Sequence, residues 1–506
     1  MSRFDRLALL LSLLAVVITY LVTMNIFEGV PHIEDEIALV WEARVIDQGT
    51  LTIATPPHPT SYLVPFVVDY NGQRFSKYPP GWPVLLAIAI RFGLRAWINP
   101  LLGGLAVWLT YRIGKRLFSE LVGILAAGLT LTSPFFLMNS GSLLSHPFGL
   151  VLTAAVALGW LEAFTPPVAK RPWIPTLAAA LCMGALVITR PYTAVGVALP
   201  FALHGIYLLV KSDMRTRTRL VVFGIIVLAC SFLYLCWQAA VTGDAFLNPY
   251  TLWWSYDKIG FGPGHGHSET GHTLRKAFIN TRFSLFAGIF DLFGWAAFSW
   301  IMLPFGIIAA RRTKTAWLVG SVFPSLVLVY AAYWVGSWLF GPRYYYEGLF
   351  SLTIFSAAGI AWLAGWPLKT GEMPSVRSGW RKARPLATTA FLSALVLFGM
   401  LVYTPMRLGS MKDLFGISLQ DQKPFLSPSA QAFTPALVIV HAARWMPYGA
   451  MIDLESPTLD SPFIFAWSIT PQIDQSLAQD FPDRKLFHYY PDRPSTLYTN
   501  PLPDEP

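Results

Sequence analysis

The sequence predicts an all-α polytopic membrane protein with about eleven or twelve transmembrane helices, followed by a small α/β module outside the membrane. The chain of 506 residues is 54% hydrophobic and only 13% charged, a composition too apolar for a soluble protein. Apolar runs close to the length that crosses a bilayer recur as far as residue 404. Basic residues gather in short clusters between these runs, which is typical of cytoplasmic loops.

Twelve apolar segments are expected to form helices. They cover residues 7–27, 82–94, 97–114, 120–138, 146–164, 173–189, 192–210, 219–237, 292–310, 316–335, 348–366 and 386–404. The first is long enough to span and no small-residue cleavage site follows it, so we expect a retained anchor rather than a signal peptide. The 82–94 segment is the weakest because it is short and holds Arg91 near its end. We expect it to form a broken hairpin with its neighbour instead of crossing.

The charge pattern places the N-terminus inside and the C-terminus outside. The basic clusters are Arg3 and Arg6, Lys170 and Arg171, Lys211 to Arg219, Arg311 to Lys314, and Lys369 to Arg384. By contrast, residues 28–77 hold seven acids and three bases, and the tail after Thr404 holds eleven acids and seven bases. The net charge of +9 therefore reflects membrane topology, and nucleic acid is not an expected partner. We expect a bacterial inner (plasma) membrane protein whose long loops are extracytoplasmic.

The chain is expected to divide at residue 404. Residues 1–404 form the predicted transmembrane domain, and residues 405–506 form the predicted extracytoplasmic module. The tail contains strand-like runs at 436–440, 448–454 and 462–469, a short helix near 475–481 and a proline-rich end from Pro491.

Two outer loops, 28–78 and 238–280, are too long to be simple connectors, and loops of this length usually carry function. The first contains apolar residues at helical spacing between Glu34 and Asp47, which predicts an amphipathic helix on the membrane surface. The second combines three aromatic residues within 253–256 with a stretch rich in glycine and histidine.

The first loop opens with the acidic triplet Glu34-Asp35-Glu36. A carboxylate beside other carboxylates has its proton affinity raised toward the working range, so Asp35 is the candidate base for a hydroxyl nucleophile. The alternative is a solvated, acidic helix N-terminus, which the helix dipole favours.

Cationic residues stand at the outer ends of three other segments. Lys77 and Tyr78 precede the Pro-Pro-Gly that opens the next helix, and Arg190 lies at a break between two apolar runs. Arg343 is followed by three tyrosines, an arrangement suited to bidentate phosphate binding and to stacking on a sugar. The alternatives are interfacial lysine and tyrosine anchors, and a pairing of Arg343 with Glu347 four residues later.

Histidines in the second loop raise the question of a metal site. His265, His267, Glu269 and His272 include ligand types that suit zinc or manganese, but the spacing is not that of a standard zinc site. A substrate-gating loop is the favoured interpretation, and no metal or other cofactor is expected to be required. His146 lies at the start of a predicted helix on the outer face. A neutral hydrogen-bonding role and a catalytic role are both open for it.

In their order along the chain, these features resemble the C-type (GT-C) integral membrane glycosyltransferases. The similar branch is that of the protein O-mannosyltransferases and lipid A aminoarabinose transferases, and the resemblance covers about residues 5–405. It implies a donor sugar carried on a polyprenyl phosphate and inversion at the sugar carbon. It also implies that Asp35 acts as the base, that Glu36 tunes or orients it, and that Lys77 and Arg343 bind the donor phosphate. One departure is Tyr78, which separates the lysine from the proline pair.

The sequence therefore predicts hexosyl or pentosyl transfer from a polyprenyl-phosphate donor to a hydroxyl of a protein, lipid or glycan acceptor at the outer face of the membrane. The candidate catalytic residues are Asp35 and Glu36, and the candidate donor- or substrate-binding residues are Lys77, Tyr78, His146, Arg190, His265, His267, His272, Arg343 and Tyr345. Membrane lipid is a further expected partner. The alternative function is a multi-span transporter or flippase of a lipid-linked or small polar substrate, but the chain shows no internal repeat and has long outer loops.

Overall fold

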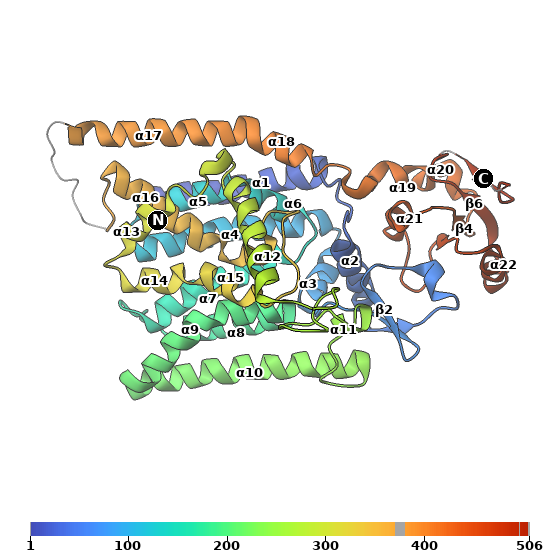
Figure 1. Ribbon diagram of the computed structural model, residues 1–506, viewed down its shortest axis with the longest axis horizontal. Coiled ribbons are helices and arrows are strands. Elements are labelled where there is room, and N and C mark those ends of the chain that lie inside the picture. The colour runs from blue at the N-terminus through green and yellow to red at the C-terminus, as the bar shows by residue number, and fades with distance from the viewer. Residues whose placement is uncertain (1, 370–379, 495, 504–506) are drawn as a thin grey trace.

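A bundle of long helices and a smaller mixed α/β unit at one of its ends make up the computed structural model, which describes residues 2–369, 380–494 and 496–503 (Figure 1). Most helices of the bundle run along the long axis of the molecule. The fold class, a mostly helical membrane protein with a small C-terminal sheet, is confirmed.

Most of the bundle helices follow the predicted apolar segments. The bundle helices are α1 (Arg3–Asn25), α3 (Gly81–Arg91), α4 (Arg95–Leu117), α5 (Glu120–Leu131), α6 (Pro134–Gly141), α7 (His146–Phe164), α8 (Trp173–Thr189), α9 (Pro191–Lys211), α10 (Met214–Thr242), α12 (Leu274–Asp291), α13 (Leu303–Ala310), α14 (Lys314–Gly320), α15 (Val322–Tyr330), α16 (Leu349–Ala364), α17 (Trp380–Phe398) and α18 (Thr404–Gly409). Short helical turns are η1 (Pro59–Tyr62), α11 (Tyr250–Trp253), η2 (Ala296–Phe298), η3 (Arg343–Gly348), the π-helical η4 (Gly399–Tyr403) and η5 (Leu414–Gly416).

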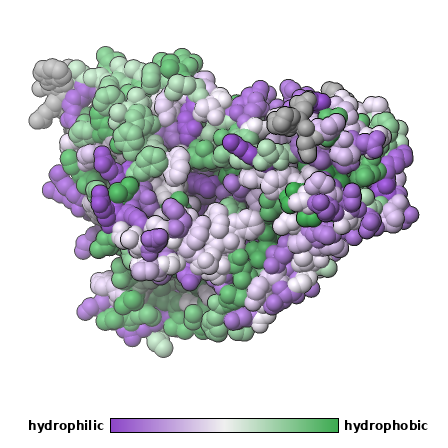
Figure 2. All heavy atoms as spheres, turned by 45° about the vertical axis from the view of Figure 1, so that its right-hand side comes forward, coloured by the Kyte–Doolittle hydropathy of each residue, from purple (hydrophilic) through white to green (hydrophobic). Residues whose placement is uncertain are grey.

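Six helices of the described chain are long and apolar enough to cross a membrane, or eight if each bent pair counts as one span. This number is below the eleven or twelve expected, because several expected segments are short or broken. Three apolar stretches are shorter, namely α3, α8 and residues 314–330. With 11 residues, α3 rises only about 16 Å, roughly half the apolar thickness of a bilayer. Hydrophobic side chains cover much of the bundle surface, whereas the C-terminal unit is richer in hydrophilic ones (Figure 2).

Two expected single helices are bent pairs. The 120–138 segment consists of α5 and α6, which meet at 61° where Pro134 opens the second helix. The 292–310 segment is only the second half of another pair, since α12 already begins at Leu274 and meets Ala296–Ala310 at 109°. The second outer loop therefore covers residues 243–273, and it is shorter than the predicted loop of 238–280.

The helix predicted in the first outer loop is α2 (Glu34–Asp47), but its position differs from the prediction. One side, including Leu39 and Val40, packs into the core of the bundle. The other side, including Ile37 and Trp41, packs into the core of the C-terminal unit. The apolar face that was expected to meet lipid packs against the C-terminal unit instead. In Figure 1, α2 lies between the two units.

The C-terminal unit is built on a four-stranded sheet in the order β5-β4-β6-β7. Its elements are α19 (Leu419–Leu426), α20 (Pro428–Gln431), β4 (Ala436–Val440), α21 (Trp445–Ile452), β5 (Phe463–Trp467), α22 (Pro471–Asp480), β6 (Lys485–Tyr489) and β7 (Leu497–Tyr498). The strand predicted at 448–454 is wrong, since this stretch lies mostly in helix α21. The physical reason is that β4 and β5 are parallel, and parallel neighbours need a crossover connection.

A buried ionic cluster joins this unit to the bundle. Asp453, at the end of α21, accepts hydrogen bonds from both terminal nitrogens of Arg95 at 2.7 Å, and Arg44 of α2 donates to it at 3.0 Å. The Asp453 side chain is only 5% exposed. Burial alone raises the pKa of this carboxyl, but the two arginines outweigh it and hold the pKa below its usual range. Asp453 thus ties α2 to α4 and to the C-terminal unit.

The remainder of the first outer loop forms a small antiparallel sheet that leads into the site. Its strands are β1 (Ile53–Ala54), β2 (Val67–Tyr70) and β3 (Gln73–Ser76), in the order β1-β3-β2. Residue Lys77 directly follows β3, and its backbone nitrogen continues the pairing by donating to the carbonyl of Phe66. This sheet therefore fixes the position of the Lys77 backbone at the end of the first outer loop.

Candidate active site

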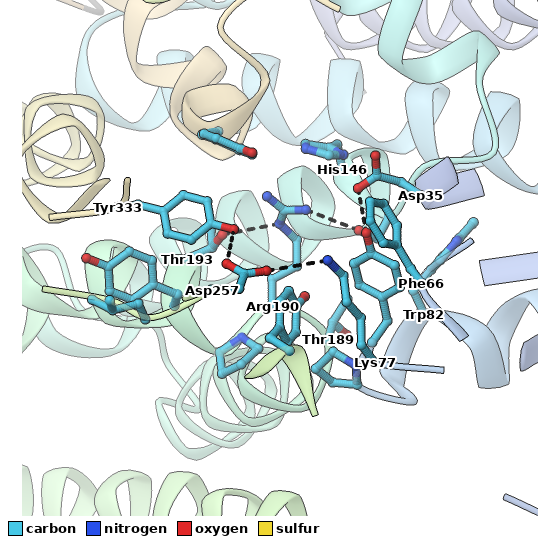
Figure 3. A pocket seen from close by; sticks show the side chains of 18 of the residues that line it. Asp35, Phe66, Lys77, Trp82, His146, Thr189, Arg190, Thr193, Asp257 and Tyr333 are labelled. Atoms are coloured by element: carbon cyan, nitrogen blue, oxygen red, sulfur yellow. Dashed lines mark hydrogen bonds and ion pairs between the residues drawn. The ribbon is translucent and has the colours of Figure 1, made fainter. Parts of the chain in front are cut away.

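A cavity of about 560 Å³ lies where the outer loops meet the ends of the bundle helices. It is lined by the start of α2, the β3–α3 connection, the start of α7, the α8–α9 junction, the second outer loop and the segment before α16. Six predicted site residues line it, namely Asp35, Lys77, Tyr78, His146, Arg190 and Arg343. These residues come from segments up to 308 positions apart in the chain, and several of their side chains converge in Figure 3.

Asp35 is held by two partners in this cavity. Its Oδ1 accepts a hydrogen bond from the Tyr78 hydroxyl at 2.7 Å, and its Oδ2 lies 3.2 Å from Nη2 of Arg343. The carboxylate side chain is 24% exposed and faces the cavity together with Glu34 of the same helix. The alternative of a fully solvated acidic helix start is therefore wrong for Asp35.

The proton affinity of Asp35 differs from the sequence prediction. Burial raises the pKa of this carboxyl. The charge of Arg343, the hydrogen bond from Tyr78 and the charge of Lys77 together lower the pKa by more than burial raises it. The pKa of Asp35 thus lies below its usual range, whereas the neighbouring acids led us to expect it above. The opposite charges and the Tyr78 hydrogen bond decide the direction, because together they outweigh the effect of burial.

Lys77 points into the cavity and has an acidic partner that the sequence did not reveal. Its Nζ lies 3.5 Å from Oδ2 of Asp257, in the second outer loop, and 3.7 Å from the ring centroid of Phe66. The rings of Tyr250 and Trp254 stand 4.8 Å and 5.0 Å from the same ammonium. The Lys77 side chain is only 4% exposed, so it is not the solvated interfacial anchor that was the alternative interpretation.

Arg190 forms the third ion pair of the region. Its Nε lies 2.9 Å from Oε1 of Glu347, whose side chain is fully buried, and its Nη1 donates to Ser145 at 3.2 Å. Glu347 fits because α7 carries glycine opposite it, since a Cβ at Gly149 would lie 2.5 Å from Oε1 of that glutamate. The suggested pairing of Arg343 with Glu347 is therefore wrong. Glu347 neutralises Arg190, and Arg343 faces Asp35.

Several buried polar atoms of the lining have no hydrogen-bond partner within the described residues. They are Nη1 of Arg343 and both ring nitrogens of His146, whose residue is 3% exposed. Buried polar groups are almost always paired, so these atoms at a cavity wall are suited to bind a ligand. The guanidinium of Arg343 and the imidazole of His146 can both donate to an anion, so this wall is the best place for a phosphate.

Other predicted site residues lie outside the cavity lining. Glu36 is fully buried and accepts hydrogen bonds from the backbone nitrogens of His32 and Leu143, at 2.9 Å and 2.7 Å. It thus fixes the start of α2 against the loop before α7. Tyr345 is 3% exposed and packs edge-on against Phe323, while the preceding tyrosine, Tyr344, lines the cavity in its place.

The three histidines of the second outer loop do not line the cavity either, and each has its own contacts. His272 stacks on Phe261 and its Nε2 contacts the carbonyl of Ala331 at 3.0 Å, whereas His267 packs against the ring of Trp334. His265 contacts the backbone of its own loop. Within residues 2–369, 380–494 and 496–503, no group of three or more acidic, histidine or cysteine side chains is arranged to hold a metal ion.

We expect transfer activity to persist in a metal chelator. Arg343 and Lys77 bring positive charge to the cavity wall, so the charge of a phosphate there is balanced without a bound ion. Activity would be measured with and without chelator for the wild type and for a variant with alanine at His265, His267 and His272. A stoichiometric, tightly held metal in the purified protein would contradict the expectation.

Several polar lining residues that carry the site's hydrogen bonds or ring contacts were not selected from the sequence. They include Asp257, Tyr330, Tyr333 and Tyr344, of which Tyr344 alone lies in a motif that was noted. The hydroxyl of Tyr333 and Nε1 of Trp334 both donate to Oδ1 of Asp257 at 2.9 Å. One signal could have found Asp257 in the sequence. It directly follows the aromatic cluster of the second outer loop, so it is an acidic residue next to aromatic residues in a long loop.

Comparison with known proteins identifies the fold but no close relative. No family model matches the chain, and no curated protein matches it in sequence. The chain is similar in structure to ArnT from Cupriavidus metallidurans, solved in the apo state and bound to undecaprenyl phosphate, with 14% and 13% identity. Each comparison covers 94% of this chain and 88% of that one, with a TM-score of 0.58.

A second similar structure is the archaeal oligosaccharyltransferase AglB from Archaeoglobus fulgidus in complex with an inhibitory peptide and a dolichol-phosphate. The identity is 13%, the match covers 91% of this chain and 65% of that one, and the TM-score is 0.51. The chain therefore shares the fold of ArnT and AglB, and the fold that the sequence resemblance implied is confirmed.

Proposed function

We propose that this protein is a glycosyltransferase that moves a hexosyl or pentosyl group from a polyprenyl-phosphate donor to an acceptor hydroxyl. The observation that carries the proposal is one wall of the cavity, where the Asp35 carboxylate faces Arg343 close to His146. Nη1 of Arg343 has no hydrogen-bond partner among the residues that the structure describes. One wall thus offers a proton acceptor and donors for an anion. The similarity in fold to a protein solved with undecaprenyl phosphate supports the donor class. The acceptor is a protein, a lipid or a glycan.

The reaction that suits this geometry is a single displacement. Arg343 and His146 hold the donor phosphate, and the aromatic side chains of the lining offer surfaces for the sugar and the first lipid units. The acceptor hydroxyl attacks the sugar carbon with inversion while Asp35 accepts its proton. The new carbon–oxygen bond replaces the bond to phosphate, and polyprenyl phosphate leaves as an anion that the cations stabilise. No metal takes part in this scheme.

Donor binding and base strength are linked through Arg343. This guanidinium lies 3.2 Å from Asp35 and contributes to the low pKa of the carboxyl. A phosphate on Nη1 and Nη2 shares the positive charge, so the pKa of Asp35 rises and the carboxylate becomes a stronger base. The cavity therefore favours donor binding before proton transfer.

Release of polyprenyl phosphate tests the proposal directly. The purified protein would be incubated with a polyprenyl-phosphate hexose or pentose and with acceptors of the three classes, and the freed lipid phosphate would be measured. We expect release that depends on acceptor and on Asp35. A transporter or flippase would move the intact donor across a vesicle without freeing lipid phosphate, and that result would overturn the proposal.

The proposed orientation places the cavity on the extracytoplasmic side of a bacterial inner membrane, because the basic clusters lie at the opposite ends of the helices. In a variant without the three native cysteines, a membrane-impermeant thiol reagent added outside should label cysteines placed at Gly72, Gly264 and Ser456. A cysteine at Thr216 should stay protected, and so should one at Ser378, which lies outside the described residues. Labelling of Thr216 from outside would reverse the orientation.

A further inference from the structure

Asp257 is a buried carboxylate that joins three segments around the cavity. Its residue is 3% exposed, and its Oδ1 accepts hydrogen bonds from the Tyr333 hydroxyl and from Nε1 of Trp334, both at 2.9 Å. Its Oδ2 is left to face Nζ of Lys77 at 3.5 Å. The two fixed bonds on one oxygen orient the carboxylate, so the second oxygen has a defined direction. Figure 3 shows Tyr333, Asp257 and Lys77 in line along one side of the cavity.

Lys77 needs such a partner because its ammonium is enclosed by aromatic rings. Burial lowers the pKa of this lysine, and the charges that oppose the change are those of Asp257 first, then Asp35, then Glu34. The pKa nevertheless lies below its usual range. Two further charged groups of the lining, Arg190 and Arg343, are both cations and therefore also disfavour a charged lysine. The protonated state of Lys77 thus depends more on Asp257 than on any other side chain.

Building on the proposed function, we infer that Asp257 is a positioning residue for the donor phosphate. It holds the ammonium of Lys77 charged and aimed into the cavity, and it keeps the second outer loop closed over that ammonium. An ammonium has three donors, and Asp257 occupies at most one of them, so the others are free to bind phosphate. Asp257 itself does not touch the donor in this scheme, since a carboxylate beside a phosphate would be repelled.

The test is the pH dependence of undecaprenyl phosphate binding to the full-length purified protein. In the wild type, affinity should hold until the pH rises through the pKa of Lys77. Asp257→Asn removes the charge that raises this pKa most, so the loss of affinity should begin at lower pH. At mildly alkaline pH we expect binding about 10- to 150-fold weaker than in the wild type, as for one lost charge-assisted hydrogen bond. The deficit should shrink as the pH is lowered.

Two further variants separate this role from a purely structural one. Asp257→Glu should keep most of the wild-type pH profile, and in a Lys77→Ala background Asp257→Asn should change the profile no further. Asp291→Asn is a matched control, because Asp291 is also 3% exposed and accepts from Tyr403 and Arg407 at 2.6 Å and 3.0 Å, away from the cavity. It should lower thermal stability and leave the pH profile of binding unchanged. The phosphate of the ligand also titrates, but it does so equally in every measurement, so its effect cancels when the pH profiles of variants are compared.

The outcomes distinguish this inference from the proposed function. Wild-type affinity at every pH in Asp257→Asn overturns the positioning role and leaves the proposed function standing. An equal loss at every pH that Asp257→Glu does not restore also overturns it, because the effect would then be structural. If the wild type itself fails to bind undecaprenyl phosphate, the proposed function fails and the role of Asp257 fails with it.

Discussion

Replacing Asp35 by asparagine is expected to lower the turnover number by about 10²- to 10⁴-fold, the usual cost of losing a general base. The protein should remain folded, because the amide has nearly the same volume and its oxygen can still accept from the Tyr78 hydroxyl. Affinity for undecaprenyl phosphate should be kept or increased, since the variant removes the carboxylate that competes with phosphate for Arg343. Turnover and binding would be measured on the same preparation.

Glu34 provides the matched control for this variant. It lies on the same turn of α2 and lines the same cavity, but no hydrogen bond or ion pair joins its side chain to Arg343 or Tyr78 within the described residues. Glu34→Gln should therefore have a much smaller effect on turnover. Near-normal turnover in Asp35→Asn, or an equal loss in Glu34→Gln, would contradict the assignment of Asp35 as the base.

The pH dependence gives the same assignment a second check. A base acts when deprotonated, and the pKa of Asp35 is held below its usual range. As the pH falls, kcat/KM should therefore decline only below about pH 4, the ordinary pKa of an aspartate. In the turnover number, which reports the donor-bound state, the decline should begin at higher pH because phosphate then shares the charge of Arg343.

Replacing Asp453 by alanine is expected to lower the free energy of unfolding by about 2 to 5 kcal/mol. The variant leaves Arg44 and Arg95 without their shared carboxylate, and truncating one partner of a buried ionic cluster carries a cost of this size. The arginine side chains are 23% and 22% exposed, which keeps the effect from being larger. Unfolding would be followed by heat or denaturant in detergent, and protease sensitivity around residues 410–418 would report release of the C-terminal unit.

Asp47, at the end of α2, offers the control for this prediction. It pairs with Arg91 at 2.7 Å, but the two side chains are 33% and 62% exposed. Solvent screens such a pair, so Asp47→Asn should change stability by no more than about 1 kcal/mol. If Asp453→Ala unfolds at the wild-type temperature, the cluster does not hold the C-terminal unit to the bundle.

Much of the secondary structure could be predicted from the sequence, because it depends on local properties of each segment. The predicted segments 146–164 and 173–189 agree with α7 and α8 to the residue, and the strand at 436–440 agrees with β4. Length and hydropathy of a run need no knowledge of the rest of the chain. The 448–454 stretch was misread because a short apolar run suits a strand or a buried helix equally, and only the parallel pairing of β4 with β5 decides between them.

The candidate site could be predicted in part. Charged residues at the outer ends of apolar segments are costly to place, and this rule selected Asp35, Lys77, Arg190 and Arg343, all of which line the cavity. The same rule could not select Asp257, because this residue lies within a long loop, where an acidic residue is common and signals no function. The three loop histidines were selected for their ligand type and their closeness in the sequence, which carry no information on the direction in which side chains point.

By itself, the sequence determined that this chain is a helical membrane protein, where most of its helices begin and end, and which charged residues stand at their outer ends. These properties follow from the thickness of a bilayer and from the cost of burying charge, which act on each segment separately. Only the tertiary structure decided that Arg343 faces Asp35, that Glu347 faces Arg190 and that Asp257 faces Lys77. Attraction between charges depends on distance through space and on burial, and here the partners are between 157 and 308 residues apart in the chain. The same physics set the pKa of Asp35 low where the neighbouring acids alone had suggested a high one.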